Sequence, residues 1–160
     1  MAHIQVQRII KAPSFKVYQY LTSPENLKEQ LAGLVTVELL NPGIEPKIGS
    51  EFLFQMERFG VDYPIRFVIE KYVTGHSFTY NQVKGLLASW RHTMRFEEKD
   101  ANATLVTDLV EYEVPFGIVG RMVDDFFARR EMRKILEYRL DKTDAHFSGD
   151  VLSVGTIQNA

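Results

Sequence analysis

Two alternating runs decide the fold of this chain: Trp90-x-His92-x-Met94-x-Phe96 and, after a polar break, Thr104-x-Val106-x-Asp108-x-Val110-x-Tyr112. In both runs every second residue points to the same side, which is the pattern of a half-buried β-strand. The polar residues between the runs indicate a turn, so we predict a long antiparallel hairpin. Most side chains on the shared face are apolar, and this face is therefore expected to lie against the core.

One imidazole and one carboxylate, His92 and Asp108, interrupt that apolar face. Burying either group alone is costly, so the two are expected to pair. If the turn is centred near Asp100, they lie directly opposite each other, with Cβ atoms about 5 Å apart. A register shifted by two makes the contact diagonal, and a one-residue bulge breaks it. Either the two side chains form a buried hydrogen bond that is only structural, or Asp108 orients His92 as a general base.

The composition excludes several classes of function. The 160 residues suit a single domain, and a net charge of −2 argues against a protein that neutralises nucleic-acid phosphates. The absence of cysteine excludes disulfides, cysteine-ligated zinc and a thiol nucleophile. Neither a signal peptide nor a membrane-spanning apolar run is visible, so we expect a cytoplasmic protein without a transmembrane segment.

Local patterns predict the order of the elements. A strand over residues 3–10 precedes two short helices, one from Pro13 to about Leu21 and one from an N-cap at Ser23 to about Ala32. Six further strands follow one another as hairpins, which makes the sheet antiparallel.

Beyond the strands, apolar residues recur at three- and four-residue spacing between Ile118 and Leu140, so we predict one long amphipathic helix. Residues 1–147 are expected to form a single domain, and the small, polar residues 148–160 a flexible C-terminal tail. The predicted fold is α+β: a curved, seven-stranded antiparallel sheet wrapped on the long helix. Such an arrangement leaves space for a ligand pocket.

These patterns together resemble the helix-grip (START-like, SRPBCC) superfamily, in its polyketide cyclase-like, hydrophobic-ligand-binding branch. The resemblance covers about residues 3–140. Its marks are Ile10-Lys11-Ala12-Pro13, Gly49, the two runs quoted above, Pro115-Phe116-Gly117-x-x-Gly120, and Tyr138-Arg139. Many relatives carry Trp-x-His-x-His-x-Phe, whereas Met94 occupies the second histidine position here. The chain also lacks the iron-sulfur cysteines and the iron-binding pattern of the superfamily's oxygenases, so neither a metal nor another cofactor is expected.

Aromatic residues and methionines on the predicted inner face are the candidate ligand contacts, and each could instead be an ordinary core residue. The candidates are Phe54, Phe67, Phe78, Tyr80, Trp90, Met94, Met122 and Phe126. The candidate catalytic residues are His92, Asp108 and Tyr112.

Three functions stay open from the sequence. The first is transport or sensing of a small hydrophobic ligand that is aromatic, polyketide-like or lipid-like. The second is a metal-independent cyclase or dehydratase, in which His92 needs a free ring nitrogen to act as the base and Tyr112 steadies an enolate oxygen. The third is a protein-interaction module whose interior is filled by side chains. No pattern in the sequence specifies an oligomeric state.

Overall fold

The computed structural model describes residues 2–115 and 118–158, with the side chains of 2–115 and 126–149. The elements follow the predicted order. They are β1 (Ala2–Ile10), α1 (Ser14–Thr22), the 3₁₀ turn η1 (Pro24–Asn26), α2 (Leu27–Leu31), β2 (Thr36–Leu39), β3 (Glu51–Arg58), β4 (Val61–Val73), β5 (Ser77–Lys84), β6 (Ser89–Asp100), β7 (Ala103–Glu113) and α3 (Ile118–Gln158).

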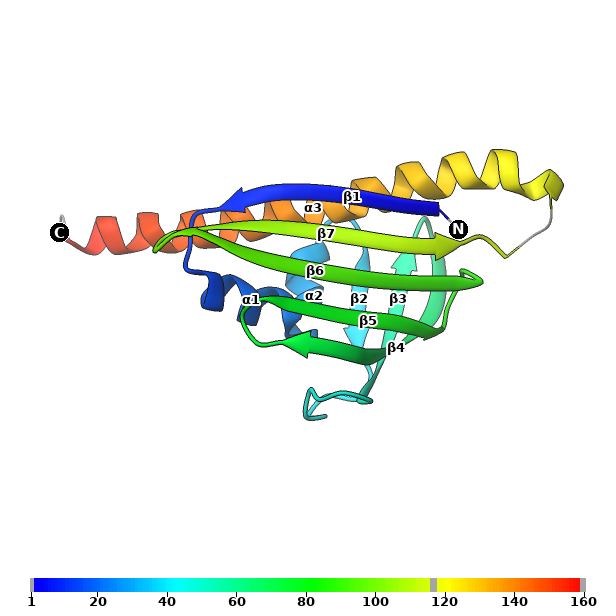
Figure 1. Cartoon of the computed structure of the whole chain (residues 1–160), viewed down its shortest axis with the longest axis horizontal. Coiled ribbons are helices and arrows are strands. Elements are labelled where there is room, and N and C mark those ends of the chain that lie inside the picture. The colour runs from blue at the N-terminus through cyan, green and yellow to red at the C-terminus, as the bar shows by residue number, and fades with distance from the viewer. Residues whose placement is uncertain (1, 116–117, 159–160) are drawn as a thin grey trace.

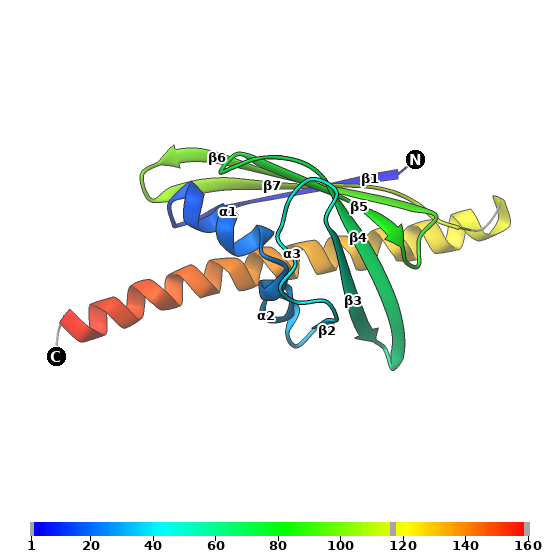
Figure 2. The same ribbon diagram turned by 90° about the horizontal axis from the view of Figure 1, so that it is seen from below.

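All seven strands form one antiparallel sheet in the order β1-β7-β6-β5-β4-β3-β2. The helix α3 runs along one side of the sheet and projects beyond it at both ends (Figure 1). Seen from below, β3 and β4 cross the direction of β6 and β7 steeply, so the sheet is strongly curved (Figure 2). The predicted α+β helix-grip fold is therefore confirmed.

Strict alternation along β7 shows how the sequence builds the core. From Thr104 to Tyr112 every second residue is buried, and Val106 and Val110 are fully inaccessible to solvent. Burying an aliphatic side chain of this size stabilises the fold by about 1.5–3 kcal/mol. The same face carries Asp108, so the strand that contributes most regularly to the core also carries a buried acid.

The long helix α3 continues past the predicted end at Leu140 and includes residues as far as Gln158. Its buried side extends from Leu140 through Thr143 to Phe147. The apolar spacing breaks after Leu140, because residues 141–144 are all polar. In the structure the hydroxyl of Thr143 donates to the carbonyl of Arg139 at 2.8 Å, which satisfies the group within the helix. The flexibility expected for residues 148–160 stays a prediction, as does the single-domain boundary at residue 147.

The predicted helix from Ser23 to Ala32 is divided into η1 and α2. Ser23 does not cap it as expected, because its hydroxyl donates to Glu25 Oε2 at 2.9 Å rather than accepting a backbone N–H. Side chains position the segment instead. The amide of Gln30 donates to the carbonyl of Tyr20 at 2.7 Å and so ties α2 to α1.

The backbone at Gly33, just after α2, lies close to the side chain of Tyr138 on α3. The φ of 92° at Gly33 favours glycine, and an added Cβ would lie 2.8 Å from Tyr138 Oη, which donates to the carbonyl of Ala32 at 2.6 Å. Gly33→Ala is expected to lower the free energy of unfolding by about 2 kcal/mol, from backbone strain and the weakened hydrogen bond. Urea denaturation measures this change.

The matched control is Gly43→Ala, where φ is 86° and nothing lies within 4 Å of the added Cβ. Backbone strain alone predicts a loss of about 1 kcal/mol there. Equal losses in the two variants would contradict the importance of the contact with Tyr138.

Candidate functional site

An apolar cavity of about 470 Å³ lies between α3 and the curved part of the sheet. This volume is typical of sites for small molecules. Strands β3 to β6 supply one wall through their inward-facing residues, and α2 and α3 supply the other. Its main lining residues are Leu27, Leu31, Met56, Tyr63, Ile65, Phe67, Tyr80, Leu87, Trp90, His92, Phe127, Ala128, Met132, Ile135, Leu136 and Arg139.

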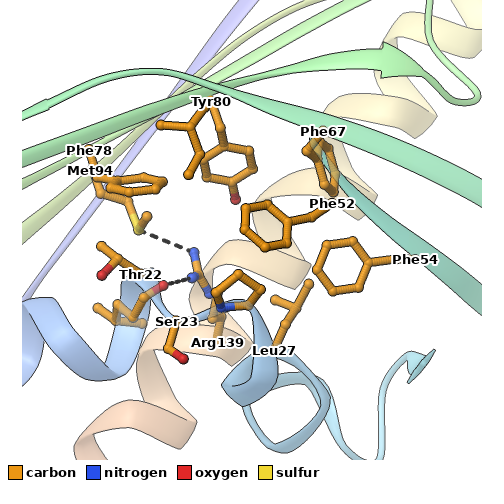
Figure 3. A pocket seen from close by; sticks show the side chains of 13 residues that line it. Thr22, Ser23, Leu27, Phe52, Phe54, Phe67, Phe78, Tyr80, Met94 and Arg139 are labelled. Atoms are coloured by element: carbon orange, nitrogen blue, oxygen red, sulfur yellow. Dashed lines mark hydrogen bonds between the residues drawn. The ribbon is translucent and has the colours of Figure 1, made fainter. Parts of the chain in front are cut away.

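The cavity has an exposed apolar mouth and a buried polar end. At the mouth Phe59 and Phe127 are 71% and 58% exposed, whereas His92 and Arg139 are 1% and 5% exposed. A smaller space of about 50 Å³ adjoins the closed end, and Tyr80 and Arg139 line both spaces. Figure 3 shows this smaller pocket, with the Tyr80 hydroxyl turned toward the side from which Arg139 enters.

The predicted pairing of His92 with Asp108 is present, but in the diagonal geometry. Asp108 lies opposite Met94, and His92 lies opposite Val110, so the directly opposed register is wrong. Close to the turn, an irregularity between Glu98 and Asp100 changes the register of the two strands. His92 Nε2 still reaches Asp108 Oδ1 at 3.0 Å, and both side chains are buried.

The second ring nitrogen of His92 is engaged by the neighbouring strand β5. Tyr80 lies directly opposite His92, and its Oη is 2.7 Å from Nδ1. Since a carboxylate only accepts hydrogen bonds, Nε2 carries the hydrogen and donates to Asp108. In the neutral imidazole Nδ1 then accepts from the Tyr80 hydroxyl. We call these three hydrogen-bonded residues, Asp108, His92 and Tyr80, the buried relay.

Burial sets the protonation state of the buried relay. It lowers the pKa of His92 below its ordinary value of 6.5, although the charge of Asp108 and its hydrogen bond act in the opposite direction. It also raises the pKa of Tyr80 to about 12, against the opposing influence of Arg139. At neutral pH the imidazole is therefore uncharged and the phenol keeps its proton.

Arg139 is a site residue that the sequence interpretation missed. Its Nε donates to Gln30 Oε1 at 2.7 Å and its Nη2 donates to the carbonyl of Leu21 at 2.6 Å. A signal was present, because Arg139 is three residues after Leu136 and four before Thr143 on the buried side of α3. From the sequence, Arg139 stands out only as part of the Tyr138-Arg139 motif.

The predicted site residues divide into three groups. Those that line the large cavity are Phe67, Tyr80, Trp90 and His92. Those that line the smaller space are Phe54, Phe67, Phe78, Tyr80 and Met94. Asp108 and Tyr112 are fully buried and line neither space, so Tyr112 is not placed to steady an enolate oxygen in the cavity.

On α3 the predicted contact Phe126 is 70% exposed and lines neither space, whereas the neighbouring Phe127 lines the large cavity. The rotation of the helix separates two adjacent phenylalanines that the apolar pattern did not distinguish. The side chain of Met122 lies outside the described residues. Within the described ranges, we find no cluster of three or more acidic or histidine side chains that could hold a metal ion. No described helix has the length and apolarity to cross a membrane.

Comparison with known proteins assigns the family. The profile of the family described as "Polyketide cyclase / dehydrase and lipid transport" matches residues 1–148, and the chain belongs to this family. No curated protein sequence matches the chain.

Solved structures share the fold at low sequence identity. A protein from Thermus thermophilus is 18% identical with a TM-score of 0.70, over 90% of this chain and 95% of that one. A Chromobacterium violaceum protein is 16% identical with a TM-score of 0.70, over 89% and 94% of the two chains. An Arthrobacter aurescens protein is 13% identical with a TM-score of 0.72, over 92% and 86%.

The lowered pKa of His92 predicts a pH dependence of stability. Below pH 6.5 the unfolded chain protonates His92 before the folded protein does, so the free energy of unfolding falls as the pH falls below that value. One proton limits this slope to about 1.4 kcal/mol per pH unit. His92→Gln is expected to remove the slope, as measured by urea denaturation between pH 7.5 and 5.5.

The control is His76→Gln, a change at an exposed histidine, which should leave the wild-type slope in place. A wild-type protein whose stability is constant or rises on acidification would contradict a neutral, buried His92. So would a His92→Gln variant with the wild-type slope.

Proposed function

We propose that this member of the polyketide cyclase / dehydrase and lipid transport family binds a small hydrophobic ligand in the cavity between α3 and the sheet, for transport or sensing. The observation that carries the proposal is the cavity of about 470 Å³ with its predominantly apolar and aromatic lining. An apolar cavity with a few polar groups at one end is the usual form of a small-molecule site.

The aromatic residues in the wall favour aromatic, polyketide-like or lipid-like ligands. The Trp90 ring lies 5.1 Å from that of Phe67 and 5.2 Å from that of Tyr80, centroid to centroid. Tilted rings at this spacing offer both faces and edges to a ligand. Removing about 300 Å² of apolar ligand surface from water contributes about 7 kcal/mol, which is partly offset by the lost freedom of the ligand.

The cyclase alternative has less support. It requires a free ring nitrogen on His92, and both nitrogens are hydrogen-bonded to Tyr80 and Asp108. Tyr112 lies away from the cavity. The interaction module with a filled interior also lacks support, since the cavity is open. We therefore prefer binding without turnover. The cytoplasmic location expected from the sequence stays a prediction.

A substitution that fills the cavity tests this function. Ala128 lines the cavity on α3, and Ala128→Phe is expected to weaken binding of the neutral fluorescent probe N-phenyl-1-naphthylamine about tenfold by occupying its space. Trp90 is the only tryptophan of the chain and lines the same cavity, so energy transfer from it to the probe reports binding inside.

The matched control is Ala145→Phe, the same change at an exposed position of the same helix. It should leave the affinity unchanged. The proposal fails if the wild-type protein shows no saturable energy transfer, or if the two variants bind the probe equally well.

A further inference from the structure

A buried cation without an acidic partner lies at the closed end of the cavity. Arg139 is 5% exposed, and its oxygen acceptors from Gln30 and Leu21 are neutral, as is the Tyr80 hydroxyl beside it. Of the ion pairs between described side chains, none includes Arg139. A buried charge is costly unless an opposite charge compensates it.

The other arginine in the cavity wall, Arg58, has the acidic partner that Arg139 lacks. Arg58 Nε donates to Glu131 Oε2 at 2.9 Å, and Arg58 Nη1 donates to the carbonyl of Leu34 at 2.9 Å. Both Arg58 and Glu131 line the cavity, so this cation already has its carboxylate. Arg139 has the same chemistry and a more buried position but lacks such a partner.

One N–H donor of Arg139 also lacks a strong hydrogen-bond acceptor. Its Nη1 points at the sulfur of Met94 at 3.5 Å, the contact drawn in Figure 3. A thioether is a weak acceptor, so this N–H gains little from the contact. A carboxylate oxygen would be a much stronger acceptor at the same place.

The buried acid of the sheet does not fill this role directly. Asp108 Oδ1 is bound by His92, and His92 is in turn bound by Tyr80. Tyr80 is the member of the buried relay that lies beside Arg139. The close partner of Asp108 is therefore His92 and not Arg139, and Arg139 lines the cavity.

We propose that Arg139 is the anchor for an acidic group and that the ligand is a hydrophobic carboxylic acid. This inference rests on the proposed function and deepens it. The carboxylate accepts from Arg139 Nη1 in place of the Met94 sulfur, while the apolar part of the ligand extends along the aromatic wall toward Phe59 and Phe127 at the mouth. A guanidinium suits this role because it stays charged, and its Nη1 can donate to the carboxylate while Nε and Nη2 keep their bonds to Gln30 and Leu21.

Two ligands that differ only in their head group test the inference on the wild-type protein. Decanoic acid and decan-1-ol are titrated at pH 8 against bound N-phenyl-1-naphthylamine. We expect the acid to displace the probe at a concentration about tenfold lower than the alcohol, as a charge-assisted hydrogen bond predicts. Equal potency overturns the acid anchor and leaves hydrophobic binding intact. If neither compound displaces the probe, the proposed ligand class and its anchor both fail.

Variants then locate the preference on one side chain. Arg139→Met is expected to reduce the acid-to-alcohol preference from about tenfold to about onefold, while Arg133→Met, the same change at an exposed arginine of the same helix, should keep it. An undiminished preference in Arg139→Met overturns the assignment. Because that variant also loses contacts to Gln30 and Leu21, Arg139→Lys serves as the second variant. It keeps the charge, and it should keep part of the preference.

Discussion

A buried imidazole with a hydrogen bond on each side holds the centre of this sheet together. His92 on β6 binds Asp108 on β7 and Tyr80 on β5, so three adjacent strands meet at one side chain. Losing either partner would leave a buried polar group unsatisfied, at a cost of about 1–3 kcal/mol. A one-residue slip of β6 would turn His92 to the opposite face. The hydrogen bonds of the buried relay therefore favour the same strand register as hydrophobic burial does.

The helix is fixed to the rest of the fold by a second set of polar contacts. Arg139 joins α3 to the end of α1 through Leu21 and to α2 through Gln30. The apolar cavity lies between this tie and the aromatic wall of the sheet. As a result, the groups that position the helix also form the polar end of the cavity, and the fold and the proposed binding site depend on the same side chains.

The sequence predicted the features that depend on local periodicity. The hairpin, the seven strands, the long helix and the pairing of His92 with Asp108 all followed from alternation, helical spacing and the cost of burying charge. Features that depend on the exact strand register or on the rotation of a helix could not be predicted from the sequence. The register of the hairpin placed Met94 opposite Asp108 and so made the histidine contact diagonal, and the rotation of α3 directed Phe127 rather than Phe126 to the cavity. Arg139 was missed because a charged residue on a helix is normally solvated.

A crystal structure of the protein with decanoic acid bound would show directly whether Arg139 anchors the acid. We expect the alkyl chain in the cavity beside Trp90, with a carboxylate oxygen about 3 Å from Arg139 Nη1 and the Met94 sulfur displaced. The buried relay should be unchanged, with both ring nitrogens of His92 still engaged. A carboxylate at the mouth beside Arg58 would contradict the role of Arg139 as the anchor. So would an alkyl chain bound outside the cavity with Arg139 still in contact with Met94.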